Sequence, residues 1–149
     1  MQQCLVLGRE SMDMGNAPVG SILVMNDQVI GTGYELGHSR NDITYHAEIE
    51  AIRDALATTG KRKLHGTVLY TTHEPCLMCT YAIRHYGVAR VVYALATGEI
   101  GGQSSQYGFL EARDMQLWGD PPQVTSGVLA KACQALQDEY LTKKGVKKS

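Results

Sequence analysis

The stretches His46-Ala47-Glu48 and Pro75-Cys76-Leu77-Met78-Cys79 decide which fold and which chemistry this chain is expected to have. One imidazole and two thiolates can fill three corners of a zinc tetrahedron and leave the fourth corner for water. The Glu48 carboxylate remains free to move the protons of that water. The two stretches together predict a catalytic site with one Zn²⁺ per chain, in which His46, Cys76 and Cys79 are the ligands and Glu48 is the catalytic acid and base.

A Cys-x-x-Cys pair by itself is also found in redox dithiols and in structural zinc knuckles. A structural site needs four protein ligands, and the two remaining cysteines, Cys4 and Cys133, lie at opposite ends of the chain. We expect both of them to be buried apolar residues. A redox dithiol gives no reason for a His-x-Glu stretch upstream. The combined pattern therefore favours a catalytic zinc site over both alternatives.

Hydrophobic periodicity places both stretches at the starts of helices. Apolar residues recur at helical intervals over residues 43–56, which predicts a helix that Asp42 or Thr44 could cap. Residues 67–72 are rich in β-branched and aromatic side chains and predict a strand. This strand leads through Pro75 into a second helix, from Cys76 to about His85, where cysteines three residues apart share one face.

The other elements complete a single α/β domain over residues 1–142, followed by a basic tail over residues 143–149. We expect helices over 4–15 and from Ser126 to 142, and strands over 19–25, 29–34, 90–95 and 123–125. This order describes a mixed sheet with helices on both faces. We expect no secretory or membrane-spanning segment, and the cysteine pattern favours the reducing cytoplasm.

The chain resembles the cytidine and deoxycytidylate deaminase superfamily, in the branch that contains tRNA adenosine deaminase, cytosine deaminase and guanine deaminase. The zinc stretches carry this resemblance, together with residues 17–20 (Ala-Pro-Val-Gly), 41–44 (Asn-Asp-Ile-Thr), 70–76 and 128–129. The resemblance implies a three-layer α/β/α cytidine-deaminase-like fold with a five-stranded mixed sheet. It also implies a homodimer and hydrolytic deamination with release of ammonia.

The resemblance further implies which residues contact the substrate. The backbone N–H of Ala47 and the backbone carbonyl of Glu74 correspond to groups that touch the reacting base in similar proteins. Tyr107 and Trp118 lie where this branch closes a lid over the base, although core packing explains both equally well. His73 adjoins the metal turn in the sequence, and we expect it to line the pocket.

Glu35 departs from the family pattern, because an ungapped alignment places it where related deaminases carry an asparagine. An ionised carboxylate only accepts hydrogen bonds, so the base would need an N–H opposite it, as a free nucleobase has. The sequence thus predicts a deaminase of a free nucleobase or related heterocycle, of cytosine or guanine type. In the alternative, Glu35 points into solvent or pairs with Arg40.

The charge balance favours the same small-molecule substrate. The chain has 15 acidic and 14 basic residues, and four lysines fall in the tail, at 143, 144, 147 and 148. An acidic body is a poor platform for a phosphate backbone. A tRNA-specific adenosine deaminase, which would use the basic tail, is the alternative, as is a nucleoside deaminase. A non-catalytic zinc module remains a third possibility, and Glu48 argues against it.

Overall fold

The computed structural model describes residues 1–146 of the 149-residue chain. Its helices are α1 (Gln2–Asp13), α2 (Gly37–Arg40), α3 (Ala47–Thr59), α4 (Leu77–Tyr86) and α5 (Ala130–Lys143), with two short 3₁₀ turns, Gly98–Ile100 and Gln116–Trp118. Its strands are β1 (Gly20–Met25), β2 (Gln28–Tyr34), β3 (Val68–His73), β4 (Arg90–Leu95) and β5 (Gln123–Thr125).

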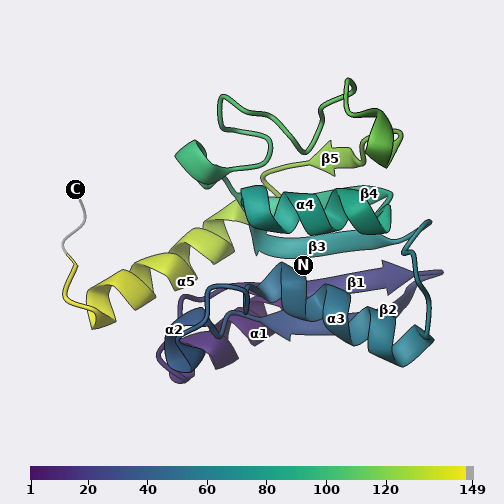
Figure 1. The fold of residues 1–149 in the computed structure, drawn as a ribbon. Helices are drawn as coiled ribbons and strands as arrows, with labels where there is room; N and C mark the ends of the chain where they lie inside the picture. The colour runs from purple at the N-terminus through teal and green to yellow at the C-terminus, as the bar shows by residue number, and fades with distance from the viewer. Residues whose placement is uncertain (147–149) are drawn as a thin grey trace.

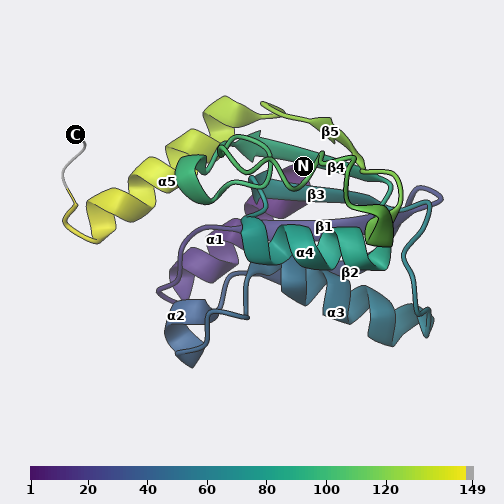
Figure 2. The ribbon, with the colours of Figure 1, turned by 45° about the horizontal axis from the view of Figure 1, so that its top comes forward.

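The strands form one sheet in the order β2-β1-β3-β4-β5. Strand β1 runs antiparallel to β2 and β3, whereas β3, β4 and β5 run parallel, so the sheet is mixed. Helices α3 and α4 lie side by side on one face, and α1 and α5 cover the other (Figure 1; Figure 2). The expected three-layer α/β/α fold with a five-stranded mixed sheet is confirmed.

The hairpin between β1 and β2 closes at Asn26 and Asp27, as the sequence predicts. Both residues adopt left-handed backbone conformations, with φ of 51° and 61°. Two successive residues of positive φ are typical of the tight turn whose twist matches that of the flanking strands. The turn pairs Met25 with Gln28, and an irregularity between Leu23 and Val24 then shifts the register by one residue, so that Ser21 pairs with Gly33.

The pairing register places one row of residues across the face of the sheet that α3 covers. Gly33 pairs with Ser21, Ser21 with Thr71, and Thr71 with Tyr93. At Gly33 the helix comes so close that a Cβ atom would lie 2.3 Å from the backbone oxygen of Ala47. Only glycine allows such an approach, so the first turn of α3 rests directly on the backbone of β2.

Two predicted helix starts are wrong. Helix α3 begins at Ala47 with His46 at its N-cap, so neither Asp42 nor Thr44 caps it. The Asp42 carboxylate instead accepts bonds from the backbone N–H and the hydroxyl of Thr44, at 2.9 and 2.8 Å, and forms a local turn. Helix α5 begins at Ala130 rather than beside Ser126, because the left-handed backbone of Leu129 cannot be part of a right-handed helix.

The C-terminal tail is described only in part. Helix α5 extends to Lys143, one residue past the expected domain boundary, and Lys144 follows it directly. Lys147 and Lys148 lie outside the described residues. Across residues 1–146, every helix is too short or too polar to cross a bilayer.

Candidate metal centre and substrate pocket

The expected metal ligands meet where two helices begin. His46 is the N-cap of α3, Cys76 is the N-cap of α4, and Cys79 lies within the first turn of α4. The three residues come together because β3, which leads into α4, is next to β1, while α3 packs over β1 and β2. The N-termini of two helices also bring positive dipole ends to the site, which favours thiolates.

The separations of the donor atoms fit one tetrahedral zinc ion. Nδ1 of His46 lies 3.5 Å from Sγ of Cys76 and 3.5 Å from Sγ of Cys79, and the two sulfur atoms are 3.7 Å apart. Tetrahedral zinc with usual bond lengths requires N···S and S···S separations of about 3.6 and 3.8 Å. His46, Cys76 and Cys79 therefore form a candidate zinc site whose fourth corner no protein ligand fills among the described residues.

The three donors share protons that a metal ion would displace, because metal binding requires a neutral imidazole and deprotonated thiols. Hydrogen bonds from Cys79 and then His46 lower the pKa of Cys76 to about 4, despite its partial burial. The Cys76 sulfur in turn raises the pKa of His46 to about 9. The pKa of Cys79 is raised by the adjacent Cys76 and by burial. Cys76 is thus a thiolate near neutral pH, the form in which cysteine binds metal.

Glu48 lies beside the donors and is also joined to the sheet by a chain of hydrogen bonds. It is 3% exposed. The Ser21 hydroxyl donates to Thr71 Oγ1 over 2.7 Å, and the Thr71 hydroxyl donates to Glu48 Oε1 over 3.3 Å. The other carboxylate oxygen lies 3.5 Å from Sγ of Cys79. Burial raises the pKa of Glu48 to about 7, a value suited to both accepting and donating protons near neutral pH.

A cavity of about 360 Å³ opens onto this cluster. His46, Cys76 and Glu48 line it, and so do three residues that the sequence predicted, Glu35, His73 and Glu74. The remaining lining residues are Ala17, Val19, His38, Thr97, Ile100 and Tyr140. His38 and Tyr140 were missed, since only the folded chain brings α2 and α5 to the same opening as the metal ligands.

Two predicted substrate contacts do not line this cavity. Trp118 packs against α4. Its ring centre lies 5.3 Å from that of Tyr81 and 5.2 Å from the guanidinium carbon of Arg84. Tyr107 is 53% exposed and lies beside Phe109, in a neighbouring hollow. Ala47 is buried as the first residue of α3, a position where the N–H has no intrahelical acceptor.

Glu35 lines the cavity, but one of its carboxylate oxygens already accepts a hydrogen bond from a nearby backbone N–H. Its Oε1 accepts a hydrogen bond from the backbone N–H of Gly37 over 2.7 Å. Burial raises the pKa of Glu35 above its usual value. Arg40, its expected alternative partner, lies over the Tyr45 ring, 4.8 Å from the centroid.

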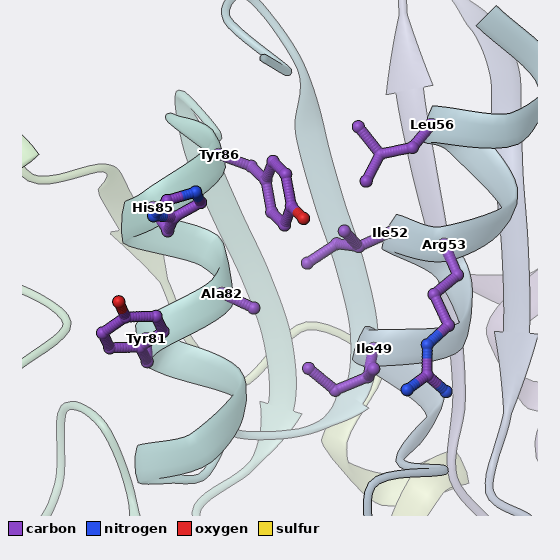
Figure 3. A pocket seen from close by; sticks show the side chains of 8 residues that line it. All are labelled: Ile49, Ile52, Arg53, Leu56, Tyr81, Ala82, His85 and Tyr86. Atoms are coloured by element: carbon purple, nitrogen blue, oxygen red, sulfur yellow. The ribbon is translucent and has the colours of Figure 1, made fainter. Parts of the chain in front are cut away.

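A second hollow, of about 350 Å³, lies between α3 and α4 (Figure 3). Its walls are mostly apolar: Ile49, Ile52 and Leu56 extend from α3, and Ala82 and Tyr86 from α4. It includes none of the three metal donors and not Glu48. The chemistry therefore belongs to the first cavity.

Known proteins resemble the chain over most of its length. Residues 1–95 match the family model of the cytidine and deoxycytidylate deaminase zinc-binding region. A tRNA-specific adenosine deaminase from Haemophilus influenzae is 33% identical over 145 residues, which cover 97% of this chain and 82% of the relative. A solved tRNA deaminase, studied for adenosine-to-inosine editing at the wobble position, superposes with a TM-score of 0.83 at 31% identity, over 91% of this chain and 96% of its own.

A solved guanine deaminase from Bacillus subtilis is 34% identical, but it covers only 64% of this chain and 61% of its own, with a TM-score of 0.61. The tRNA-specific enzymes combine identities of 33% and 31% with coverage of 97% and 91% of this chain, and they contradict the prediction of a free-nucleobase substrate. That prediction relied on Glu35 as an unengaged acceptor, whereas Gly37 already occupies one of its oxygens.

The family match, the shared fold and a donor set spaced for zinc agree with one another. The chain belongs to the cytidine and deoxycytidylate deaminase family of zinc-dependent hydrolases.

Proposed function

We propose that this protein is a tRNA-specific adenosine deaminase that hydrolyses adenosine at the wobble position to inosine and releases ammonia. The similarity to tRNA-specific adenosine deaminases over 97% of the chain is the observation that carries this proposal. Glu48, buried beside the donor cluster, supports catalysis over a purely structural zinc module, which would have no use for such a carboxylate.

Zinc held by His46, Cys76 and Cys79 would supply an acidified water next to the base. Glu48 would take one proton from the attacking water and deliver it to N1 of adenine, while the water oxygen bonds to C6. Glu48 would then transfer the second proton to the amino group, so that the C6–N bond breaks and ammonia leaves. We assign the Ala47 N–H and the Glu74 carbonyl to orienting the base, since Ala47 is the first residue of α3 and Glu74 lies two residues before the N-cap of α4.

The distribution of charge supports an RNA substrate better than net charge does. Tyr140 lines the cavity, and Lys143 and Lys144 follow it at the end of α5. The Lys144 ammonium lies 5.8 Å from the centre of the Tyr140 ring. Lys144 thus places one cation beside a residue of the cavity wall, whereas Lys143 forms an ion pair with Glu139 over 3.1 Å. A single-stranded tRNA loop could place its phosphates there and direct one unstacked base into the cavity.

We propose that the enzyme acts as a homodimer in the cytoplasm, as a single deaminase domain over residues 1–142 with a basic tail. The resemblance to its branch of the family supports the dimer. The four free cysteines support a reducing compartment. Sedimentation equilibrium of the zinc-loaded protein tests the dimer, and a monomer at micromolar concentration would contradict it.

The substrate is tested by incubating zinc-loaded protein with anticodon stem–loop RNAs that carry adenosine at the wobble position or at a neighbouring position. Inosine is read by mass spectrometry of nucleosides, and ammonia is measured in parallel. Adenosine, adenine, cytosine and guanine are tested separately as alternative substrates. The Glu48→Ala variant is the inactive control. We expect inosine at the wobble position alone. Release of ammonia from a free base, without inosine in the RNA, would contradict the proposal.

A further inference from the structure

The side chain of Glu74 is buried although it is charged. It is 2% exposed and lies two residues before the zinc ligand Cys76. Among residues 1–146, no lysine, arginine or histidine forms an ion pair with it. A buried carboxylate is costly unless hydrogen bonds compensate for the lost water, so its partners must lie in the surrounding chain.

Those partners all come from the segment 97–104. Oε1 accepts bonds from the backbone N–H groups of Gln103 and Ser104, both at 2.7 Å. Oε2 accepts from the Thr97 N–H at 2.9 Å and from the Ser104 hydroxyl at 2.6 Å. The Ser104 hydroxyl also accepts from the Gly98 N–H, at 3.2 Å. One carboxylate thus joins both ends of the segment.

The fit between the carboxylate and the segment is close. A Cβ at Gly101 would lie 2.5 Å from Oε1 of Glu74, so the backbone wraps directly around the carboxylate. The Gly102 N–H donates to the Pro75 carbonyl over 2.8 Å, and Gly101 forms a bridge with Cys76. The segment is therefore fastened both to Glu74 and to the turn that carries a zinc ligand.

The fastened segment also forms a wall of the substrate cavity. Thr97 and Ile100 line the cavity, while the Glu74 carboxylate is turned into the segment behind them. The Thr97 hydroxyl lies 3.5 Å from the Glu74 carbonyl oxygen. The carboxylate bonds thus place the wall relative to the metal centre.

We propose that Glu74 is a positioning residue whose carboxylate holds residues 97–104 in place as the wall that receives the target base. The segment is a preformed part of the pocket and needs no substrate to order it. Three backbone N–H groups and one hydroxyl converge on the carboxylate, so a neutral side chain of the same shape cannot replace it. This role is separate from that of the Glu74 backbone carbonyl, and it rests on the proposed function only for the identity of the base.

Hydrogen exchange of the zinc-loaded protein without substrate tests the holding role. Glu74→Gln keeps the shape but points an NH₂ group at donors. We expect amides of 97–104 to exchange about 10- to 100-fold faster, the effect of losing bonds to a charged acceptor. Glu99→Gln makes the same chemical change at an exposed position in the same segment and should exchange as wild type does. Ser104→Ala removes the hydroxyl that donates to Glu74 and accepts from the Gly98 N–H, but it keeps the three backbone donors to the carboxylate. It should therefore give a smaller increase, which keeps the test valid if Glu74→Gln folds poorly.

Zinc content and steady-state kinetics on the stem–loop RNA distinguish positioning from catalysis. We expect Glu74→Gln to retain stoichiometric zinc, to raise KM about tenfold and to change kcat less than about threefold, because the wall contributes to binding throughout the reaction. Wild-type exchange rates in both variants, or loss of zinc from Glu74→Gln, would overturn the proposal. If wild type does not edit RNA, the proposed function fails, whereas the exchange result still decides the role of Glu74.

Discussion

The Thr71 hydroxyl donates a hydrogen bond to the Glu48 carboxylate, 3.3 Å away, and joins strand β3 to the first turn of helix α3. Thr71 in turn accepts from Ser21 of β1, so three buried side chains form one chain of polar contacts under the metal donors. The Thr71 bond fixes the oxygen of Glu48 that does not face Cys79. The sheet thereby orients Glu48.

Replacing Thr71 with valine removes this hydroxyl and nearly conserves volume. We expect kcat to fall about tenfold with zinc retained, because Glu48 loses one orienting bond to a charged group. The matched control is Thr67→Val, since Thr67 is also buried but its hydroxyl binds the Leu64 carbonyl. Stopped reactions on the stem–loop RNA measure kcat. Equal losses in the two variants would point to general destabilisation.

Replacing Glu48 with alanine or glutamine removes the group that carries protons. We expect turnover to fall by about 10²- to 10⁴-fold while zinc stays bound, because Glu48 is not among the three donors. Glu50 lies two residues after Glu48 and forms an ion pair with Arg53. The Glu50→Gln variant is therefore the control and should keep its activity. An active Glu48→Ala protein with full zinc content would rule out the assigned mechanism.

Removing zinc should cost both activity and stability. A chelator leaves two sulfur atoms and an imidazole close together without a cation, and the metal-bound form is stabilised by mass action. We expect a lower Tm and no turnover after treatment with dipicolinate, and recovery of both on adding Zn²⁺. His46→Ala should show a low Tm even with added zinc. Cys133→Ala, a buried cysteine outside the cluster, should retain one zinc per chain by elemental analysis.

His73 should make the protein less stable in mild acid. Burial lowers the pKa of His73 below its usual value of about 6.5. Between its folded pKa and about 6.5 the unfolded chain binds a proton that the folded chain does not, so the free energy of unfolding falls as pH falls through this window. We expect His73→Asn to flatten the decline in urea-unfolding free energy below pH 6.5. His65→Asn, at an exposed position, should decline as wild type does.

The cations at the end of α5 should contribute to RNA binding without reading its sequence. We expect Lys144→Gln to weaken binding of the stem–loop and to reduce the slope of log affinity against log salt by about one. Filter binding at several salt concentrations measures this slope. Lys131→Gln, an exposed lysine near the start of α5, is the matched control. An unchanged slope for Lys144→Gln would remove this residue from the RNA interface.

Local sequence patterns predicted the metal centre because its ligands lie at fixed offsets from helix starts. Cys76 and Cys79 share one helical turn, and His46 and Glu48 another, so spacing alone places each pair. The cap of α3 was predicted wrongly because Asp42 forms a turn with Thr44, a competing use of the same short polar side chain.

The substrate pocket could not be read from the sequence to the same extent. His38 and Tyr140 enter the cavity from α2 and α5, which only the tertiary fold brings together. Net charge sums over the whole surface, whereas the Lys144 ammonium lies 5.8 Å from the ring centre of Tyr140, which lines the cavity. Trp118 was left open between a substrate contact and core packing, and the structure places it against α4, a contact that no local pattern specifies.

The meeting of Gly33 with Ala47 has a consequence for any redesign of this enzyme. Because the backbones of β2 and α3 are in direct contact there, the distance between the start of α3 and the sheet does not depend on the size of any side chain between them. Directed evolution could then exchange apolar residues at the remote end of α3, around Leu56, with little displacement of the imidazole at its start. A methyl group added at Gly33 would instead lift the whole helix and carry a zinc ligand and the proton carrier away from the thiolates together.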